Sequence, residues 1–250
     1  MQTIMDVVLE LDQIIAHCAA TKNKAGYFAA LYKRMTIAVK QGVADNVFEN
    51  GKRMEQLDLN FAKRYIDAFF AYSNDLPCSA SWKFAFDSCK NDKLTVIQHL
   101  LIGINTHINL DLAIAAALTS PGNSINDLQN DFNKINDVIS SLVNDVQEAL
   151  CEVWLPMRML TKIANGRQEA VLNFSIDKAR TLSWTNAIAL AEILNDQQQT
   201  YIEQMDTTVQ KIGMGIVSPG MLATATLQAI RATEYDNIAR TINLIDTTVV

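Results

Sequence analysis

The sequence is poor in the residues that interrupt regular structure. Its 250 residues include only 9 glycines and 4 prolines. Because these residues supply most turn signals, their scarcity favours long helices. Alternation of apolar and polar residues with period two is absent beyond a few positions, so we predict no β-sheet. Hydrophobic residues make up 49% of the chain, which is enough for a substantial core and argues against disorder.

Cysteine and positive charge are also scarce. The 4 cysteines form no C-x-x-C pair, which favours free thiols in a reducing compartment. The net charge is −6 and no basic run occurs, so we expect neither a nucleic-acid nor a membrane partner. The start, MQTIMDVVLELDQ, lacks the basic segment of a secretory signal. Polar residues interrupt every apolar run before it reaches the ~20 residues that cross a bilayer. We therefore expect a cytoplasmic protein.

Several familiar catalytic motifs are missing. The sequence contains no G-x-S-x-G, P-loop, G-x-G-x-x-G or H-E-x-x-H. We therefore expect no cofactor, and a divalent metal is the alternative considered below.

Apolar residues recur at helical spacing along most of the chain. We predict helices over residues 4–18, 25–40, 51–72, 79–89, 93–118, 125–153 and 175–211, and a final helical region after Pro219. Gly42 is expected to end the second helix, Pro156 to break the sixth, and residues 165–167 to form a loop. The fold class is all-α. We expect a single domain over 1–250, a helical bundle with long antiparallel C-terminal helices around a buried central helix at about 93–118.

The helix predicted over 125–153 carries a heptad pattern of apolar residues. Packing within the bundle is the favoured interpretation of this pattern. A homodimer formed through the same helix is the alternative.

The central helix combines a core-like composition with polar residues, in the segment QHLLIGINTHINLDLAIAAAL. On a wheel of ~100° per residue, one apolar stripe is expected to pack in the core. It comprises Leu94, Ile97, Leu101, Ile104, Ile108 and Leu112. The opposite face is mostly small and carries His99. Asn105 and Asn109 lie on one flank, and His107 and Asp111 lie on the other. Small residues on a buried face indicate either close helix contact or a cavity.

His107 and Asp111 are four residues apart and therefore share a helix face. Three interpretations are open: Asp111 orients His107 as a general base, the two residues bind a metal, or Asp111 pairs with a basic residue of the third helix. His99 is a second candidate catalytic residue, and Asn105 and Asn109 are candidate substrate ligands.

A second concentration of polar residues lies at 52–70. A solvated helix surface is the favoured interpretation of this segment alone. If it packs on the central helix, its candidate substrate-binding residues are Glu55, Asp58, Arg64 and Tyr65. Glu55 and Asp58 would then also join His107 and Asp111 as metal ligands.

Four segments, GYFAALYKRM, RMEQLDLNFAKRY, WKFAFD and HLLIGINTHINLDL, resemble a bacterial family of helical domains of unknown function with a His-Ile-Asn signature. The resemblance spans roughly residues 26–112. It implies a helical fold and draws attention to His107, Asn109, Asp111, Glu55 and Asp58, without assigning them any chemistry.

Three functional hypotheses follow. The first is an enzyme that acts on a small hydrophobic molecule by His107/Asp111 acid–base chemistry, as an isomerase, cyclase, lyase or hydrolase. The second is a metal-dependent enzyme that uses His107, Asp111 and a carboxylate of helix 51–72. The third is a non-catalytic small-molecule-binding or scaffold protein.

Overall fold

The computed structural model describes residues 1–135, 167–234 and 236–247. Within these ranges every regular element is a helix, which confirms the all-α prediction. The helices are α1 (Ile4–Thr21), α2 (Ala25–Ala44), α3 (Gly51–Ser73), α4 (Ala80–Ser88), α5 (Val96–Thr106), α6 (Ala113–Thr119), α9 (Arg167–Glu192), α10 (Asn195–Val217), α11 (Met221–Arg231) and α12 (Ile238–Thr247). Residues 125–135 are also helical.

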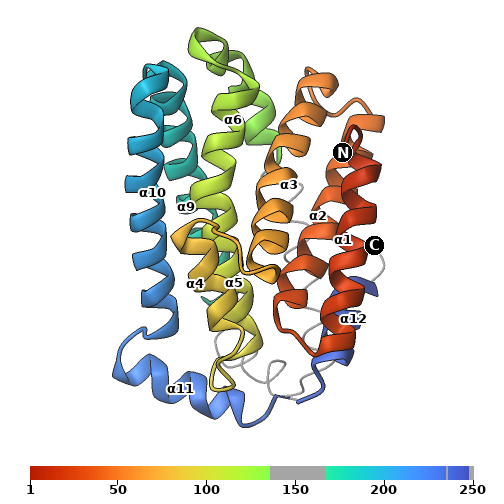
Figure 1. The fold of residues 1–250 in the computed structure, drawn as a ribbon, viewed down its shortest axis with the longest axis vertical. Coiled ribbons are helices and arrows are strands. Elements are labelled where there is room, and N and C mark those ends of the chain that lie inside the picture. The colour runs from red at the N-terminus through yellow and green to blue at the C-terminus, as the bar shows by residue number, and fades with distance from the viewer. Residues whose placement is uncertain (136–166, 235, 248–250) are drawn as a thin grey trace.

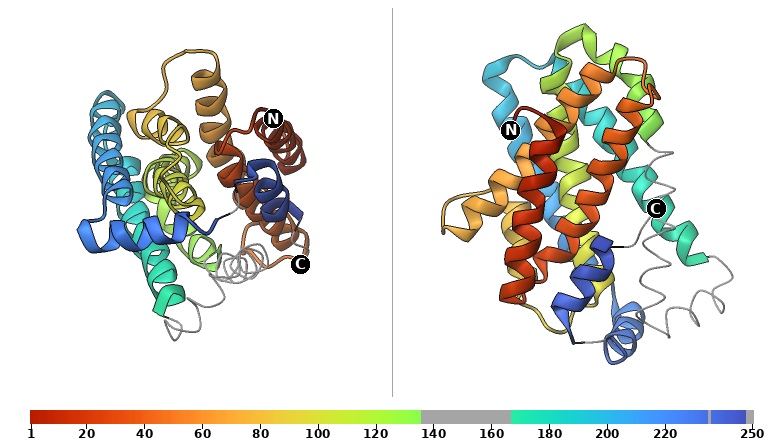
Figure 2. Two further views of the ribbon diagram at one scale, coloured as in Figure 1. Left: turned by 90° about the horizontal axis from the view of Figure 1, so that it is seen from below. Right: turned by 90° about the vertical axis from the view of Figure 1, so that its right-hand side faces the viewer.

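The central helix is built from α5, a π-helical segment η1 (His107–Leu112) and α6. It lies between two groups of helices (Figures 1 and 2). On one side α1, α2, α3 and α12 pack together. On the other side α9 and α10 run antiparallel beside each other (Figure 1). The central position confirms the predicted helical bundle, whereas the single-domain organisation stays a prediction.

Local signals explain where several helices begin. At the start of α1, Thr3 and Asp6 form a capping box, in which each side chain accepts the other residue's backbone N–H. Thr95 and Gln98 form the same motif at the start of α5. At the start of α4, the Ser79 side chain accepts from the Trp82 backbone N–H.

Three predicted boundaries were wrong. The central helix starts at Val96 instead of about residue 93. Helix α2 continues past Gly42 to Ala44; Gly42 is a close-packing position, since a Cβ atom there would lie 2.9 Å from the Phe48 ring. Arg167, expected in a loop, begins α9.

The helix predicted over 175–211 is in fact parts of two helices. Helix α9 ends at Glu192 and α10 begins at Asn195, after Leu194 adopts extended backbone angles. The Gln198 side-chain amide donates to the carbonyls of Leu190 and Ile193, so the α9 end is satisfied without glycine or proline. Because no glycine or proline marks the end of α9, the sequence contains no turn signal for the break between the two helices.

The heptad helix is described only as far as residue 135. Its first four core positions, Ile125, Leu128, Phe132 and Ile135, are buried inside the bundle. Asp131, also fully buried, accepts from the backbone N–H groups of Glu49 and Asn50 at 2.6 and 3.0 Å and so fixes this helix to the start of α3. The rest of the predicted helix to 153, the Pro156 break and residues 165–166 lie outside the described residues.

One expectation about membranes needs correction. Among the described helices, the continuous segment Val96–Thr119, 24 residues long, is apolar enough to cross a bilayer by length and composition. The polar residues within it do not prevent this, contrary to the prediction. In the fold, 78% of the most apolar 18-residue stretch of this segment is buried inside the bundle.

Candidate functional site

The central helix changes its hydrogen bonding at the sequence HINLDL. Residues His107–Leu112 form a π-helix between two α-helical segments. Such wide turns are rare and often occur at functional sites. Because the wider turn shifts all later side chains around the axis, a wheel of ~100° per residue cannot describe the whole segment.

The predicted core stripe was wrong because the central helix is surrounded by other helices, so its opposite face is buried more completely. Leu94 and Leu112 are buried, but Ile97, Leu101, Ile104 and Ile108 are only half-buried. The small opposite face is buried instead. At Gly103 the approach of α2 is so close that a Cβ atom would lie 2.6 Å from the Phe28 ring.

Asp111 is the centre of a buried polar network. Its Oδ1 accepts from Arg64 Nε of α3 at 2.9 Å, and its Oδ2 accepts from Trp82 Nε1 of α4 at 2.8 Å. His107 Nδ1 lies 3.0 Å from the same Oδ2. The pairing of Asp111 with a basic residue of the third helix is therefore confirmed, and Asp111 also contacts His107, while the general-base role of His107 stays a prediction.

This network fixes the tautomer of His107. A carboxylate that is paired with Arg64 accepts hydrogen bonds, so Nδ1 carries the imidazole proton and Nε2 presents its lone pair. Nε2 is buried and has no hydrogen-bond partner among the described residues. Burial lowers the pKa of His107 below its usual value of 6.5, and Asp111 only partly offsets this. The ring is thus a neutral base at pH 7.

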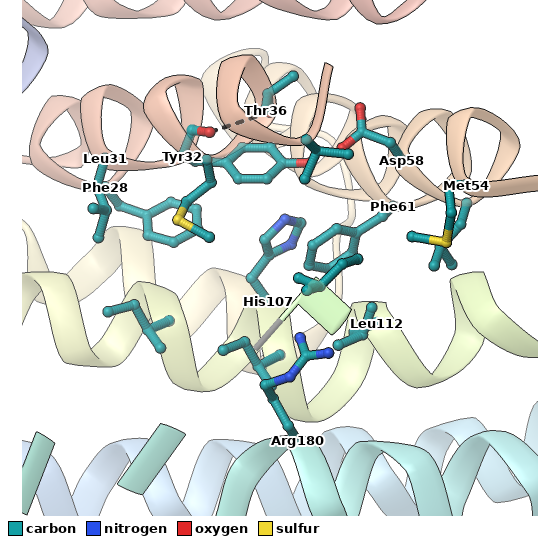
Figure 3. Close-up of a pocket in the computed structure, with 16 residues that line it drawn as sticks. Phe28, Leu31, Tyr32, Thr36, Met54, Asp58, Phe61, His107, Leu112 and Arg180 are labelled. Atoms are coloured by element: carbon teal, nitrogen blue, oxygen red, sulfur yellow. Dashed lines mark hydrogen bonds between the residues drawn. The ribbon is translucent and has the colours of Figure 1, made fainter. Parts of the chain in front are cut away.

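Aromatic rings hold the imidazole in place. The Phe61 ring stacks on it with a centroid distance of 3.6 Å and an angle of 9° between planes. The Tyr32 and Phe28 rings meet it edge-on at 4.4 and 5.5 Å. His107 therefore projects from η1 towards α2 and α3 in a single orientation (Figure 3).

His107 lies on the wall of a cleft between α2, α3 and the central helix, with a volume of about 100 Å³. We call it the His107 cleft. Its lining is mostly apolar: Phe28, Leu31, Tyr32, Met35, Thr36, Val39, Met54, Leu57, Asp58, Phe61, Ile104, His107, Ile108, Leu112, Ile135 and Arg180. Arg180 enters from α9, on the opposite side from α2 (Figure 3).

Two further polar groups of the His107 cleft lack partners within the described part of the chain. Asp58 Oδ2 is buried without a hydrogen bond, and burial followed by the charge of Glu55 raises the pKa of Asp58 to about 7. The hydroxyl of Tyr32 is likewise buried and unpaired. Burial and Asp58 raise the pKa of Tyr32 well above 10, so this hydroxyl keeps its proton at neutral pH.

The other predicted site residues lie elsewhere. Glu55 is half-buried and does not line the cleft. Tyr65 is fully buried behind it, packed against Phe28 and Trp82. Asn105 Nδ2 donates to the Val209 carbonyl of α10, and Asn109 Nδ2 donates to Asn105 Oδ1. These two amides face α10, as their position on the other flank indicated, and they do not line the His107 cleft.

Sequence reasoning missed Tyr32, Phe61 and Trp82 as parts of this site. The only signal for Tyr32 and Phe61 was weak: both are aromatic residues within the segments that carry the family resemblance. Trp82 could be found only by knowing that α4 packs beside the central helix. No three His, Cys, Asp or Glu side chains of the described residues gather as a metal site, and the metal hypothesis gains no support from their arrangement.

Comparison with known proteins places the chain by family only. No curated protein and no solved structure matches it. A family model described as a family of unknown function, DUF5995, matches residues 4–219, which include the whole central helix and the His107 cleft. The chain therefore belongs to the DUF5995 family.

Proposed function

We propose that this protein binds a small, largely apolar molecule in the His107 cleft and catalyses a proton transfer on it, with His107 as the general base. The observation that carries this proposal is the buried, unpartnered Nε2 of a histidine whose other nitrogen is held by Asp111. A buried polar group without a partner costs about 1–3 kcal/mol, which a ligand hydrogen bond would recover.

The cleft also supplies a proton donor. Burial lowers the pKa of His107 and raises the pKa of Asp58 to about 7. At a pH above the lowered pKa of His107 and below about 7, the imidazole is neutral and the Asp58 carboxyl group is protonated, so a base and an acid coexist. Pairs of groups whose environments push their pKa values apart in this way are typical of acid–base catalysis.

The lining favours some reaction classes over others. The described lining residues include no serine, cysteine or lysine that would act as a covalent nucleophile. Thr36 is present, but its hydroxyl already donates to the Tyr32 carbonyl. Proton abstraction and return, as in an isomerase or lyase, therefore fits the cleft better than hydrolysis through a covalent intermediate.

The test begins with binding. A library of small apolar compounds is screened by thermal shift against the wild-type protein and against Ile108→Trp. Ile108 is a half-buried lining residue, and an indole there occupies the cleft. We expect compounds that bind in the His107 cleft to raise the melting temperature of the wild type but not that of Ile108→Trp.

Each such compound is then incubated with protein in D₂O, and deuterium uptake at carbon is followed by mass spectrometry. His107→Asn keeps a donor for Asp111 but removes Nε2, and we expect exchange to slow by at least 10²-fold, the usual contribution of a general base. His17→Asn, on the exposed face of α1, is the matched control and should exchange like the wild type. Equal exchange rates in His107→Asn and wild type would refute the catalytic assignment, and binding without exchange would reduce the function to ligand binding.

A further inference from the structure

A second hollow lies at the end of the bundle where α2 and α5 begin. Its volume is about 340 Å³, and it shares no lining residue with the His107 cleft. We call it the His99 hollow. It is lined by Lys24, Tyr27, Asp92, Leu94, Val96, His99, Arg231, Glu234, Asp236 and Ile238. Unlike the cleft, it is dominated by charged and polar groups.

His99 lines this hollow and has no partner within the described residues. The residue is 6% exposed, and neither Nδ1 nor Nε2 makes a hydrogen bond. Burial, followed by the charges of Lys24 and Arg231, lowers the pKa of His99 to about 3. The ring is therefore neutral and offers one donor and one acceptor to whatever fills the hollow.

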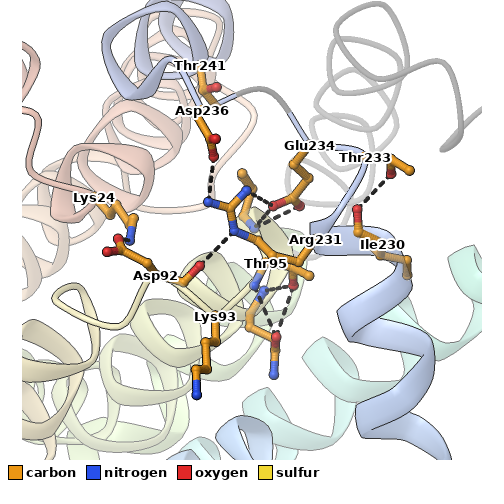
Figure 4. A network of polar contacts seen from close by, with 12 residues as sticks. Lys24, Asp92, Lys93, Thr95, Ile230, Arg231, Thr233, Glu234, Asp236 and Thr241 are labelled. Carbon is orange, nitrogen blue, oxygen red and sulfur yellow. Dashed lines mark hydrogen bonds and ion pairs between the residues drawn. The ribbon is translucent and has the colours of Figure 1, made fainter.

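A buried carboxyl group lies in the same hollow. Glu234 accepts from the backbone N–H of Val96 at 2.9 Å, at the first turn of α5 (Figure 4). Burial raises the pKa of Glu234 to about 7. Near neutral pH this group is available to a cation or to a hydrogen-bond donor.

Each cation of the hollow has one exposed carboxylate partner beside its fixed ones. Lys24 Nζ also donates to the Asn91 carbonyl, Arg231 Nε donates to the Asp92 carbonyl, and Arg231 Nη1 lies 3.9 Å from Glu234 Oε2. Lys24 Nζ, on a side chain only 7% exposed, pairs with Asp92 Oδ1 at 2.6 Å, but the Asp92 side chain is 88% exposed. Arg231 Nη2 pairs with Asp236 Oδ1 at 2.7 Å, and Asp236 is 85% exposed. Ion pairs with such exposed carboxylates contribute little stability, so a bound carboxylate can replace them.

These groups together select the charge of the ligand. Two cationic side chains, those of Lys24 and Arg231, and three carboxyl groups, those of Asp92, Glu234 and Asp236, line the hollow, so an anionic group and a cationic group of a ligand would each find a partner there. A zwitterion adds no net charge and matches both kinds of group. We propose that the His99 hollow binds a free α-amino acid. Its carboxylate pairs with Lys24 and Arg231, its ammonium group pairs with Glu234, and His99 hydrogen-bonds to the bound molecule.

The experiment uses the full chain and the twenty common amino acids, each tested at millimolar concentration by thermal shift and then by calorimetry. Every amino acid that binds is compared with the amine and the carboxylic acid that carry the same side chain. We expect at least one amino acid to bind, with an affinity at least tenfold higher than that of either matched compound. Glu234→Gln and His99→Leu should each weaken its binding at least tenfold. His17→Leu, which changes an exposed histidine, should leave it unchanged.

The proposal is overturned if no amino acid binds, if the matched amine or acid binds as tightly, or if both folded variants keep wild-type affinity. Should His99→Leu fail to fold, Glu234→Gln carries the comparison, because its side-chain oxygen can still accept from Val96. A crystal structure of the wild-type protein with the bound amino acid then tests the site directly. Electron density for the amino acid outside the His99 hollow would also overturn the proposal.

Discussion

Asp58 should make the stability of the protein depend on pH in a direction opposite to that of an ordinary paired carboxylate. Its folded-state pKa is raised from 3.8 to about 7, chiefly by burial. Below pH 3.8 the carboxyl group is protonated in both the folded and the unfolded state, so it does not lower the free energy of unfolding. As the pH rises from there to about 7, the unfolded chain releases the proton while the folded chain retains it, so stability is lost across this window.

The size of the effect follows from the shift. One pKa unit corresponds to 1.36 kcal/mol, so a shift of about three units removes on the order of 4 kcal/mol of stability above pH 7. Asp58→Asn cannot ionise and should not show this loss. The variant should therefore gain stability relative to the wild type as the pH rises from 4 to 8.

The assay is urea unfolding at half-unit pH intervals, with the difference between variant and wild type as the readout. The difference cancels contributions from other titrating groups such as Glu234 and His99. Asp67→Asn, an exposed carboxylate on the same helix, is the control and should give a difference that varies little with pH. A flat difference curve for Asp58→Asn would mean that Asp58 is paired or hydrated in solution, and Asp58 would then no longer serve as the proton donor of the cleft.

Three other substitutions probe the supports of the site. Trp82→Phe removes the indole donor to Asp111 and should destabilise the protein by about 1.5–3 kcal/mol in urea unfolding, whereas a loss below 0.5 kcal/mol would contradict that hydrogen bond. Gly103→Ala forces a methyl group against Phe28 and should cost about 1–3 kcal/mol; an unchanged melting temperature would show that α2 and α5 lie further apart. Asp131→Asn weakens the buried contact between the 125–135 helix and α3, and we expect a loss of about 3 kcal/mol, with Asp127→Asn as the control on the same helix.

Much of the fold could be predicted because its signals are local. Helical periodicity gave the positions of α1 to α4. The i, i+4 spacing of His107 and Asp111 correctly indicated that their side chains meet. Such contacts depend only on the geometry of one helix, so an isolated sequence carries them.

The remainder of the site depends on long-range packing. Arg64 and Trp82 are 47 and 29 residues from Asp111, and no local pattern pairs them with it. The spacing in the sequence also could not show that Asp58 would be buried in the cleft while Glu55 would stay outside it. No turn residue in the sequence indicates the π-helix, and the wheel of ~100° per residue does not hold beyond His107.

The polar residues of the central helix therefore serve different purposes, although they looked like one set in the sequence. Asn105 and Asn109 join the helix to α10, and their amide-to-carbonyl bonds would be expected of internal structure. Asp111 is satisfied by three donors. Among the described residues Asn109 Oδ1 is buried and unpaired away from both hollows, whereas His107 keeps one unpaired nitrogen and His99 keeps two, each beside a hollow. Structural networks are stable when every member is paired. Unpaired ring nitrogens beside a hollow can be satisfied by a ligand, and this is the physical argument behind the two proposed binding sites.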